Sequence, residues 1–292
     1  MTNRNQQRKR TSYAQNFLIR ANLARRIVER AAIQPDDLVI EIGPGRGALT
    51  HCLAHGCRQV IAIEKDPTLA RRLGREVGAH GNVAIFEGDF FDLPLPLTPY
   101  KVVANIPFNV TAAIVNKLTG AVNPPEGTAL IIQREAAERF LGEPKQTLAA
   151  LLLGPWFELQ IADRFRQQDF VPPPRVEVVL LRFSKRGPPL ICPQEAQVYR
   201  DFVTFVFTAW KPTIGDALGT ILPRGALARL TRRGVVNLAL KPSEVSFDGW
   251  LSLFRAFLGG ATPSQRQAIR GAEERLRREQ ARIEKRPRPD AS

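Results

Sequence analysis

The sequence predicts an α/β fold, with a mostly parallel sheet, an antiparallel edge strand and a small helical C-terminal domain. Short apolar runs alternate with helix-period segments from residue 37 to about residue 154, the pattern of a parallel sheet covered by helices on both faces. Two strand-like runs, 158–165 and 175–183, have no helix between them and predict an antiparallel pair at the edge. Helical spacing with many aromatic residues then covers 194–259.

The individual elements follow from local patterns. The first helix, "ANLARRIVERAAI", has apolar residues at helical spacing and stops before Pro35. The segment "PTLARRLGREVG" begins with proline at the first helical position and ends on glycine. The other predicted helices are "ALTHCLAHG", "TAAIVNKLT", "REAAERFL" and "QTLAALLLG". The predicted strands before residue 158 are "DLVIEIG", "QVIAIE", "NVAIFEGD", "YKVVAN" and "TALIIQ".

Composition shifts divide the chain into four parts. Residues 1–12 are basic and lack an apolar period, so we expect a flexible arm. The alternating region and edge pair define a domain over 13–185, which a Pro- and Gly-rich stretch separates from a helical domain over 190–260. Residues 262–292 contain few large aliphatic side chains and predict a basic tail that is either a frayed helix or disordered.

The overall charge favours a polyanionic partner. The 292 residues have a net charge of +14 and a pI near 10.5, and neutralising phosphates releases condensed counterions. A solvated basic surface is an equally good explanation of the charge alone. Three cysteines without framework spacing fit a reducing cytoplasm, and no apolar run approaches the ~20 residues that span a bilayer. We therefore expect a cytoplasmic, soluble protein with no membrane partner.

A glycine-rich loop, "EIGPGRGALT", follows the first strand of the alternating region. Gly43, Gly45 and Gly47 allow a sharp turn and a close approach to a ligand, although glycines here can also simply make the turn. Glu64 ends the second strand, where its carboxylate can accept hydrogen bonds from ribose hydroxyls. Asp89 ends the third, where it can accept the exocyclic amine of an adenine. The Gly-x-Gly-x-Gly spacing differs from the dinucleotide fingerprint, so the set favours S-adenosylmethionine over NAD.

The segment "NIPF", residues 105–108, ends the fourth strand beside the presumed donor. The Asn105 amide oxygen and the Ile106 carbonyl can accept the two hydrogens of an aromatic amine and aim its lone pair at a methyl carbon. Pro107 fixes the backbone, and Phe108 offers a face for a flipped base, worth roughly 1–3 kcal/mol. The alternative is a strand-ending turn in which Asn caps and Pro breaks.

Together with "QNFL" at 15–18 and "FVPPPRVEVVLLRF" at 170–183, these motifs resemble the rRNA adenine N6-methyltransferase family. That family includes the erythromycin-resistance (Erm) methylases of 23S rRNA and the 16S rRNA adenine dimethylases. The resemblance implies a Rossmann-like class I methyltransferase sheet. It also implies that S-adenosylmethionine binds Asn16, Leu18, Gly43, Glu64, Asp89 and Asn105, and that Asn105 and Phe108 face the target adenine. We place Gly45, Gly47, Lys65 and Phe90 in the same expected donor-binding set.

Within the family, three segments resemble the actinobacterial-type Erm proteins more than the 16S dimethylases. They are "QTLAALLLGPWFELQIADRF", the "F-x-PPPRV" that follows it, and "NIPF". The expected function is therefore transfer of one or two methyl groups to one flipped adenine of 23S rRNA, before full ribosome assembly, by a monomer. Such methylation would confer resistance to macrolide, lincosamide and streptogramin B drugs. A 16S dimethylase and a non-catalytic nucleic-acid-binding relative are the alternatives.

Several basic residues are candidate RNA ligands, although solvated helix faces would account for many of them. The candidates are Arg8, Lys9, Arg10, Arg134, Arg139, Arg224, Arg229, Arg232 and Arg233. The cluster His51, Cys52, His55 and Cys57 suggests zinc, but it directly follows the glycine loop and has no second ligand pair. We therefore expect no metal.

Overall fold

The structure is a computed structural model that describes residues 17–18, 21–232, 234 and 236–284. It divides into two compact units. The sheet unit contains the chain up to Glu138 together with Phe157–Arg186, and the helical unit contains Arg139–Trp156 together with the chain from Gly187 onward. The predicted Asn16, Arg8, Lys9, Arg10 and Arg233 lie outside the described residues.

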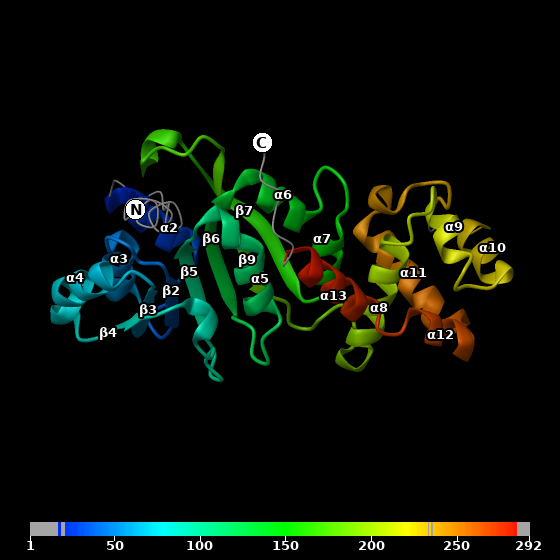
Figure 1. Ribbon diagram of the computed structural model, residues 1–292, viewed down its shortest axis with the longest axis horizontal. Helices are drawn as coiled ribbons and strands as arrows, with labels where there is room; N and C mark the ends of the chain where they lie inside the picture. Colours follow the sequence, from blue (N-terminus) through cyan, green and yellow to red (C-terminus); the bar gives the residue numbers. More distant parts are fainter. Residues whose placement is uncertain (1–16, 19–20, 233, 235, 285–292) are drawn as a thin grey trace, which may run out of the picture. The chain divides into compact units, whose positions relative to one another are not determined.

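The main sheet has the strand order β4-β3-β2-β5-β6-β9-β7 in the described part of the chain (Figure 1). The strands from β4 to β6 are all parallel, β9 runs antiparallel to β6, and β7 runs antiparallel to β9. A Rossmann-like fold with antiparallel strands at one edge is thus confirmed. The strands are β2 (Leu38–Ile42), β3 (Gln59–Glu64), β4 (Val83–Glu87), β5 (Lys101–Asn105), β6 (Gly127–Gln133), β7 (Phe157–Phe165) and β9 (Val178–Lys185).

A separate two-stranded pairing joins distant parts of the sheet unit. Strand β1 (Phe17–Leu18) pairs antiparallel with β8 (Phe170–Val171), so that Leu18 lies opposite Phe170. Phe170 is buried in the core of the sheet unit together with Leu23 and Ile27. This pairing fixes the start of the described chain beside the sheet.

Helices cover both faces of the sheet, as the alternation predicts (Figure 1). Asp66 caps α4 by accepting hydrogen bonds from the amides of Thr68 at 2.8 Å and Leu69 at 3.2 Å, a cap typically worth about 1 kcal/mol. Every residue of β2 is buried, including Glu41, because this strand lies in the middle of the sheet. The helices are α2 (Ala21–Arg30), α3 (Ala48–Gly56), α4 (Pro67–Val77), α5 (Thr111–Thr119) and α6 (Arg134–Leu141), which runs from the sheet unit into the helical unit.

The helical unit has its own aromatic core. Phe202, Trp250, Phe254 and Phe257 are fully buried, and the Tyr199 hydroxyl donates to the Leu151 carbonyl at 2.8 Å. That bond ties α7 to this unit, whereas the sequence led us to expect residues up to 185 in one domain. Sequence order alone cannot tell which core Leu151 enters. The helices are α7 (Leu148–Leu153), α8 (Ala196–Phe207), α9 (Ile214–Leu218), α10 (Arg224–Arg232), α11 (Phe247–Gly260), α12 (Pro263–Ile269) and α13 (Ala272–Glu284).

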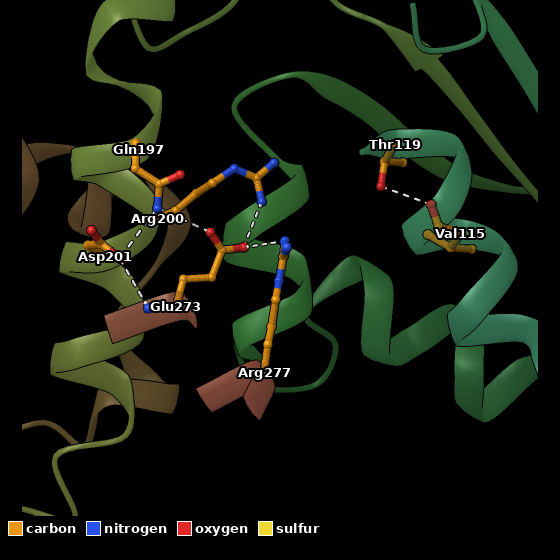
Figure 2. A network of polar contacts seen from close by, with 7 residues as sticks. All are labelled: Val115, Thr119, Gln197, Arg200, Asp201, Glu273 and Arg277. Carbon is orange, nitrogen blue, oxygen red and sulfur yellow. Dashed lines mark hydrogen bonds and ion pairs between the residues drawn. The ribbon is translucent and has the colours of Figure 1, made fainter. Parts of the chain in front are cut away.

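Helices α12 and α13 lie in the part of the chain for which the composition predicts either a frayed helix or a disordered tail. Figure 2 shows the polar network that holds α13 on α8. Asp201 accepts the amides of Gly271 at 2.9 Å and Glu273 at 3.1 Å, and Glu273 pairs with Arg200 at 3.2 Å and Arg277 at 2.7 Å. Both carboxylates are buried. Because the partners are about 70 residues apart in sequence, local composition does not reveal them.

No helix among the described residues is both long and apolar enough to cross a bilayer.

Candidate functional site

The glycine loop follows β2 at the carboxyl edge of the sheet, where ligands bind in open α/β folds. Gly43, Gly45 and Gly47 have φ angles of 67°, 60° and 82°, which strain any residue with a side chain. At Gly47 an added Cβ would also lie 2.4 Å from Leu73 Cδ1. The loop therefore needs its glycines, and its backbone is exposed to whatever occupies this edge.

Glu64 fixes the loop against the end of β3. Its Oε2 accepts the amide of Gly45 at 3.0 Å, and its Oε1 accepts the amide of Asp66 at 2.9 Å. The side chain is only 3 % exposed. Each carboxylate oxygen can accept more than one hydrogen bond, so Glu64 can hold the loop and still receive hydroxyl donors from a ligand.

Asp89 begins a tight turn after β4. Lys65 pairs with its Oδ2 at 2.6 Å, and the Phe91 amide donates to its Oδ1 at 3.0 Å. These two bonds hold the pKa of Asp89 below its usual range, and the bond from Lys65 is the larger cause. Phe90 follows and is buried, so the two predicted donor-binding residues of this turn have different environments.

Lys117 of α5 holds this turn from the other side, a role that sequence reasoning missed. Its Nζ donates to the carbonyls of Phe90 at 2.6 Å, Phe91 at 3.0 Å and Leu93 at 2.6 Å. It also lies 4.7 Å from the centre of the Phe90 ring, a favourable cation–π distance. Burial lowers the pKa of Lys117. The helix that follows "NIPF" thus also orders the Asp89 turn.

The "NIPF" segment leaves the sheet directly beside the glycine loop. Asn105 is the last residue of β5, which pairs with β2 on one side and β6 on the other. Ile106 is buried, and Pro107 has φ −60° and ψ 132° before a single 3₁₀ turn. Phe108 is partly buried against the sheet core, and its carbonyl accepts the Thr111 hydroxyl at 3.1 Å. The segment is therefore anchored at both ends.

One cavity brings several predicted residues together. It is lined by Phe17, Leu18, Glu41, Gly43, Pro44, Arg46, Ala48, Leu49 and Asn105. Leu18, Gly43 and Asn105 come from separate sequence motifs. The parallel neighbours β2 and β5 bring Gly43 and Asn105 together, and Leu18 reaches the same cavity from β1. Arg46 of the loop lies 4.8 Å from the centre of the Phe17 ring, and this contact packs β1 against the loop. The lining does not include the other described residues of the predicted donor-binding set, which are Gly45, Gly47, Glu64, Lys65, Asp89 and Phe90. Of these, Glu64 is hydrogen-bonded directly to the loop.

Glu41 is the principal residue of this site that sequence reasoning missed. It lies in β2, lines the cavity and is 1 % exposed, and neither carboxylate oxygen has a hydrogen-bond partner of ordinary geometry. Burial raises the pKa of Glu41 to about 8, nearby Thr50 opposes the shift, and the Glu64 charge adds to it. A buried acid without a partner is costly. A cationic ligand group would relieve that cost, so the cavity fits a cation.

We expect replacement of Glu41 by glutamine to stabilise the protein at alkaline pH. The folded chain keeps the Glu41 proton up to pH about 8, whereas an unfolded chain loses it near 4.5. The wild-type free energy of unfolding therefore falls between these values and levels off above them. The free energy of unfolding of E41Q should exceed that of the wild type by an amount that grows over the same pH window. At about 1.4 kcal/mol per pKa unit, this difference reaches a few kcal/mol. Urea unfolding at pH 5 and pH 8.5 measures it, with E135Q on the exposed face of α6 as control. A pH-independent difference would contradict the assignment.

The predicted RNA ligands have different surroundings. Arg134 pairs with Glu138 at 2.6 Å and Glu177 at 2.7 Å, so much of its charge is already compensated. Arg139 on the same helix is exposed, as are Arg229 and Arg232 on α10. Arg224 begins α10. No group of three or more His, Cys, Asp or Glu side chains in the described residues is placed to hold a metal ion.

Comparison with known proteins identifies the family of this chain. The family model for ribosomal RNA adenine dimethylase matches residues 6–257. An rRNA adenine N-6-methyltransferase of Corynebacterium diphtheriae is 35% identical over 72% of this chain and 81% of its own length. A ribosomal RNA small subunit methyltransferase A of Prochlorococcus marinus is 32% identical over 84% of this chain and 93% of its own length.

A solved structure of the 23S rRNA methyltransferase ErmE superposes with a TM-score of 0.77 and 31% identity. The match covers 83% of this chain and 99% of that one. The loop, the acidic strand ends and "NIPF" thus occur in a chain that matches this family over most of its length. The protein belongs to the ribosomal RNA adenine dimethylase family.

Proposed function

We propose that this protein transfers one or two methyl groups from S-adenosylmethionine to the N6 of a single adenine in 23S rRNA, and so confers macrolide, lincosamide and streptogramin B resistance. The observation that carries the proposal is the cavity in which Asn105 meets the glycine loop and Glu41. One wall of this cavity suits a cationic donor, and the other suits an amine acceptor.

On the donor side, S-adenosylmethionine supplies an electrophilic methyl group on a sulfonium cation. Glu41 accepts a positive group of the donor, since among the described residues its buried carboxylate has no cationic partner and only Thr50 as a hydrogen-bonding neighbour. Glu64 receives the ribose hydroxyls with its remaining lone pairs. Asp89, kept ionised by Lys65, receives the adenine amine. Leu18 bounds the site with apolar surface, the buried Phe90 supports the Asp89 turn through its contact with Lys117, and the glycines allow close backbone approach.

On the acceptor side, the target adenine leaves its RNA stack and packs on Phe108. The Asn105 side-chain oxygen and the Ile106 carbonyl accept the two N6 hydrogens. These bonds draw lone-pair density out of the ring and point it at the methyl carbon, an effect of orientation and electrostatics. As the bond between N6 and the methyl carbon forms, the sulfur–methyl bond of the donor breaks and its electron pair stays on sulfur, so that the donor leaves as a neutral thioether. The N6 group becomes cationic and then gives one proton to water. Because Phe108 lacks a hydroxyl, its contribution is stacking.

The 23S target is supported by the extent of the likeness to ErmE. The likeness to a small subunit methyltransferase supports the alternative, 16S rRNA. Incubation of protein-free 23S and 16S rRNA with labelled donor, followed by primer extension, separates the two. We expect one modified adenine position, in 23S rRNA. Label in 16S alone would overturn the 23S assignment.

We also propose that the helical unit contributes to RNA binding through α10. Replacing Arg229 and Arg232 with glutamine should weaken RNA binding and flatten the slope of log K against log salt by about 0.7 for each lost phosphate contact. Both side chains are exposed, so the fold should be unaffected. Filter binding at several salt concentrations measures the slope, and an unchanged slope removes α10 from the footprint.

A further inference from the structure

An arginine-lined groove lies in the sheet unit. It shares no lining residue with the cavity formed by Leu18, Glu41, Gly43 and Asn105, which we call the donor cavity. The volume of the groove is about 420 Å³. Its lining includes Asn22, Leu23 and Arg26 of α2, Arg164 near the end of β7, and Arg166, Gln168 and Asp169 of the segment that joins β7 to β8. Ligand pockets commonly have volumes of roughly 300–1,000 Å³. The groove is large enough for a sugar–phosphate unit, and its lining is almost entirely polar.

The positive charge of the groove is only partly compensated. Arg26 is held by an ion pair with Asp163 at 2.8 Å and lies 6.0 Å from the centre of the Phe165 ring. The guanidinium groups of Arg164 and Arg166 form no hydrogen bond or ion pair within the described residues. The charge of Arg164 does act on Glu177, whose pKa is lowered mainly by Arg134 and also by Arg164. This differs from Arg134, which has two acidic partners.

Asp169 adds one negative charge to the groove but forms no ion pair with its arginines among the described residues. Its Oδ2 accepts the Arg166 backbone amide at 2.9 Å and shapes the turn that follows Arg166. Arginine is well suited to phosphate oxygens, because its planar group donates two parallel hydrogen bonds. The lining therefore combines one pre-positioned arginine with two whose N–H groups have no acceptor among the described residues.

The groove is linked to the donor cavity through the β1–β8 pairing. Asp169 in the groove is followed by Phe170, which pairs with Leu18, and Leu18 lines the donor cavity. One backbone ladder thus connects the two sites within the sheet unit.

We propose that this groove binds the phosphates of the rRNA strand that flank the target adenosine, with Arg164 and Arg166 as the phosphate ligands and Arg26 as their pre-positioned neighbour. The inference rests on the proposed function in requiring an rRNA substrate, but not on which rRNA it is. The groove orients the strand while the cavity performs the transfer, and phosphate contacts of this kind fix position rather than sequence.

The test is the double variant R164Q/R166Q in the full chain, assayed on whichever rRNA the wild type methylates. We expect the KM for RNA to rise about tenfold and the salt slope of RNA binding to flatten by about 1.4, at about 0.7 per phosphate. The donor Kd, the thermal unfolding midpoint and the modified position should not change. The charge-conserving R164K/R166K variant should recover most of the salt slope.

The control is R72Q on α4, which removes an arginine that is 63% exposed and paired with Glu76. It should change the KM for RNA less than twofold. If R164Q/R166Q leaves both the KM for RNA and the salt slope of RNA binding unchanged, the groove does not bind RNA. The proposal also fails if R72Q raises the KM for RNA as much, per arginine removed, as R164Q/R166Q does. These outcomes are independent of the mapping experiment, which alone decides between 23S and 16S rRNA.

Discussion

The N105A variant is expected to transfer methyl groups about 10²–10³-fold more slowly than the wild type, with RNA affinity retained. This is the usual cost of removing one pre-organised hydrogen-bond acceptor or donor from a transition state. Asn105 ends β5 inside the donor cavity. The alanine variant lacks the side-chain oxygen that aims the adenine lone pair, while the backbone carbonyl of Ile106 remains. Single-turnover transfer from labelled donor gives the rate, and filter binding gives the RNA affinity.

The matched control for this variant is N116A, which removes an exposed asparagine from α5 without touching the cavity. It should leave the transfer rate within twofold of the wild type. If N105A loses RNA binding and transfer to the same extent, Asn105 has a structural role and the proposed acceptor geometry is wrong. A normal rate in N105A would contradict it equally.

The E64A variant is expected to bind S-adenosylmethionine about 100-fold more weakly. Each hydrogen bond to a charged group contributes about 1.5–3 kcal/mol, and we assign two ribose bonds to Glu64, so a loss of roughly 3 kcal/mol corresponds to this factor. Glu64 also holds Gly45 and Asp66, so the loop loosens as well. Calorimetric titration with the donor measures the change.

Two further variants make the Glu64 result specific. E64Q keeps the volume and one acceptor oxygen, and should weaken donor binding about tenfold, between wild type and E64A. E87A removes an exposed acid at the end of the neighbouring β4 and should leave the donor Kd unchanged. An unaltered Kd in E64A, with a normal unfolding midpoint, would rule out the ribose assignment.

Local sequence was sufficient for the elements and motifs of the sheet unit. Alternating strands and helices predict a parallel sheet, and the sheet places the ends of β2, β3 and β5 at one edge. The glycines of the loop were predicted from their spacing, and their positive φ angles give the reason. "NIPF" was predicted as a site because an apolar strand ending in Asn, Pro and Phe is unusual next to such a loop. Periodicity and turn chemistry are properties of neighbouring residues, so the sequence reveals them.

Tertiary structure decided what depends on residues far apart in the chain. The raised pKa of Glu41 arises from burial in the middle of the sheet, and Lys117 reaches carbonyls 24 to 27 residues earlier. The chain entering α13 is held by Asp201, and Arg134 is paired with Glu177, 43 residues away. The sequence by itself determined the fold class and the motifs at the strand ends. Only the packed structure decided which charges are buried, which are paired and which face solvent, because burial and pairing depend on all the residues that meet at a position.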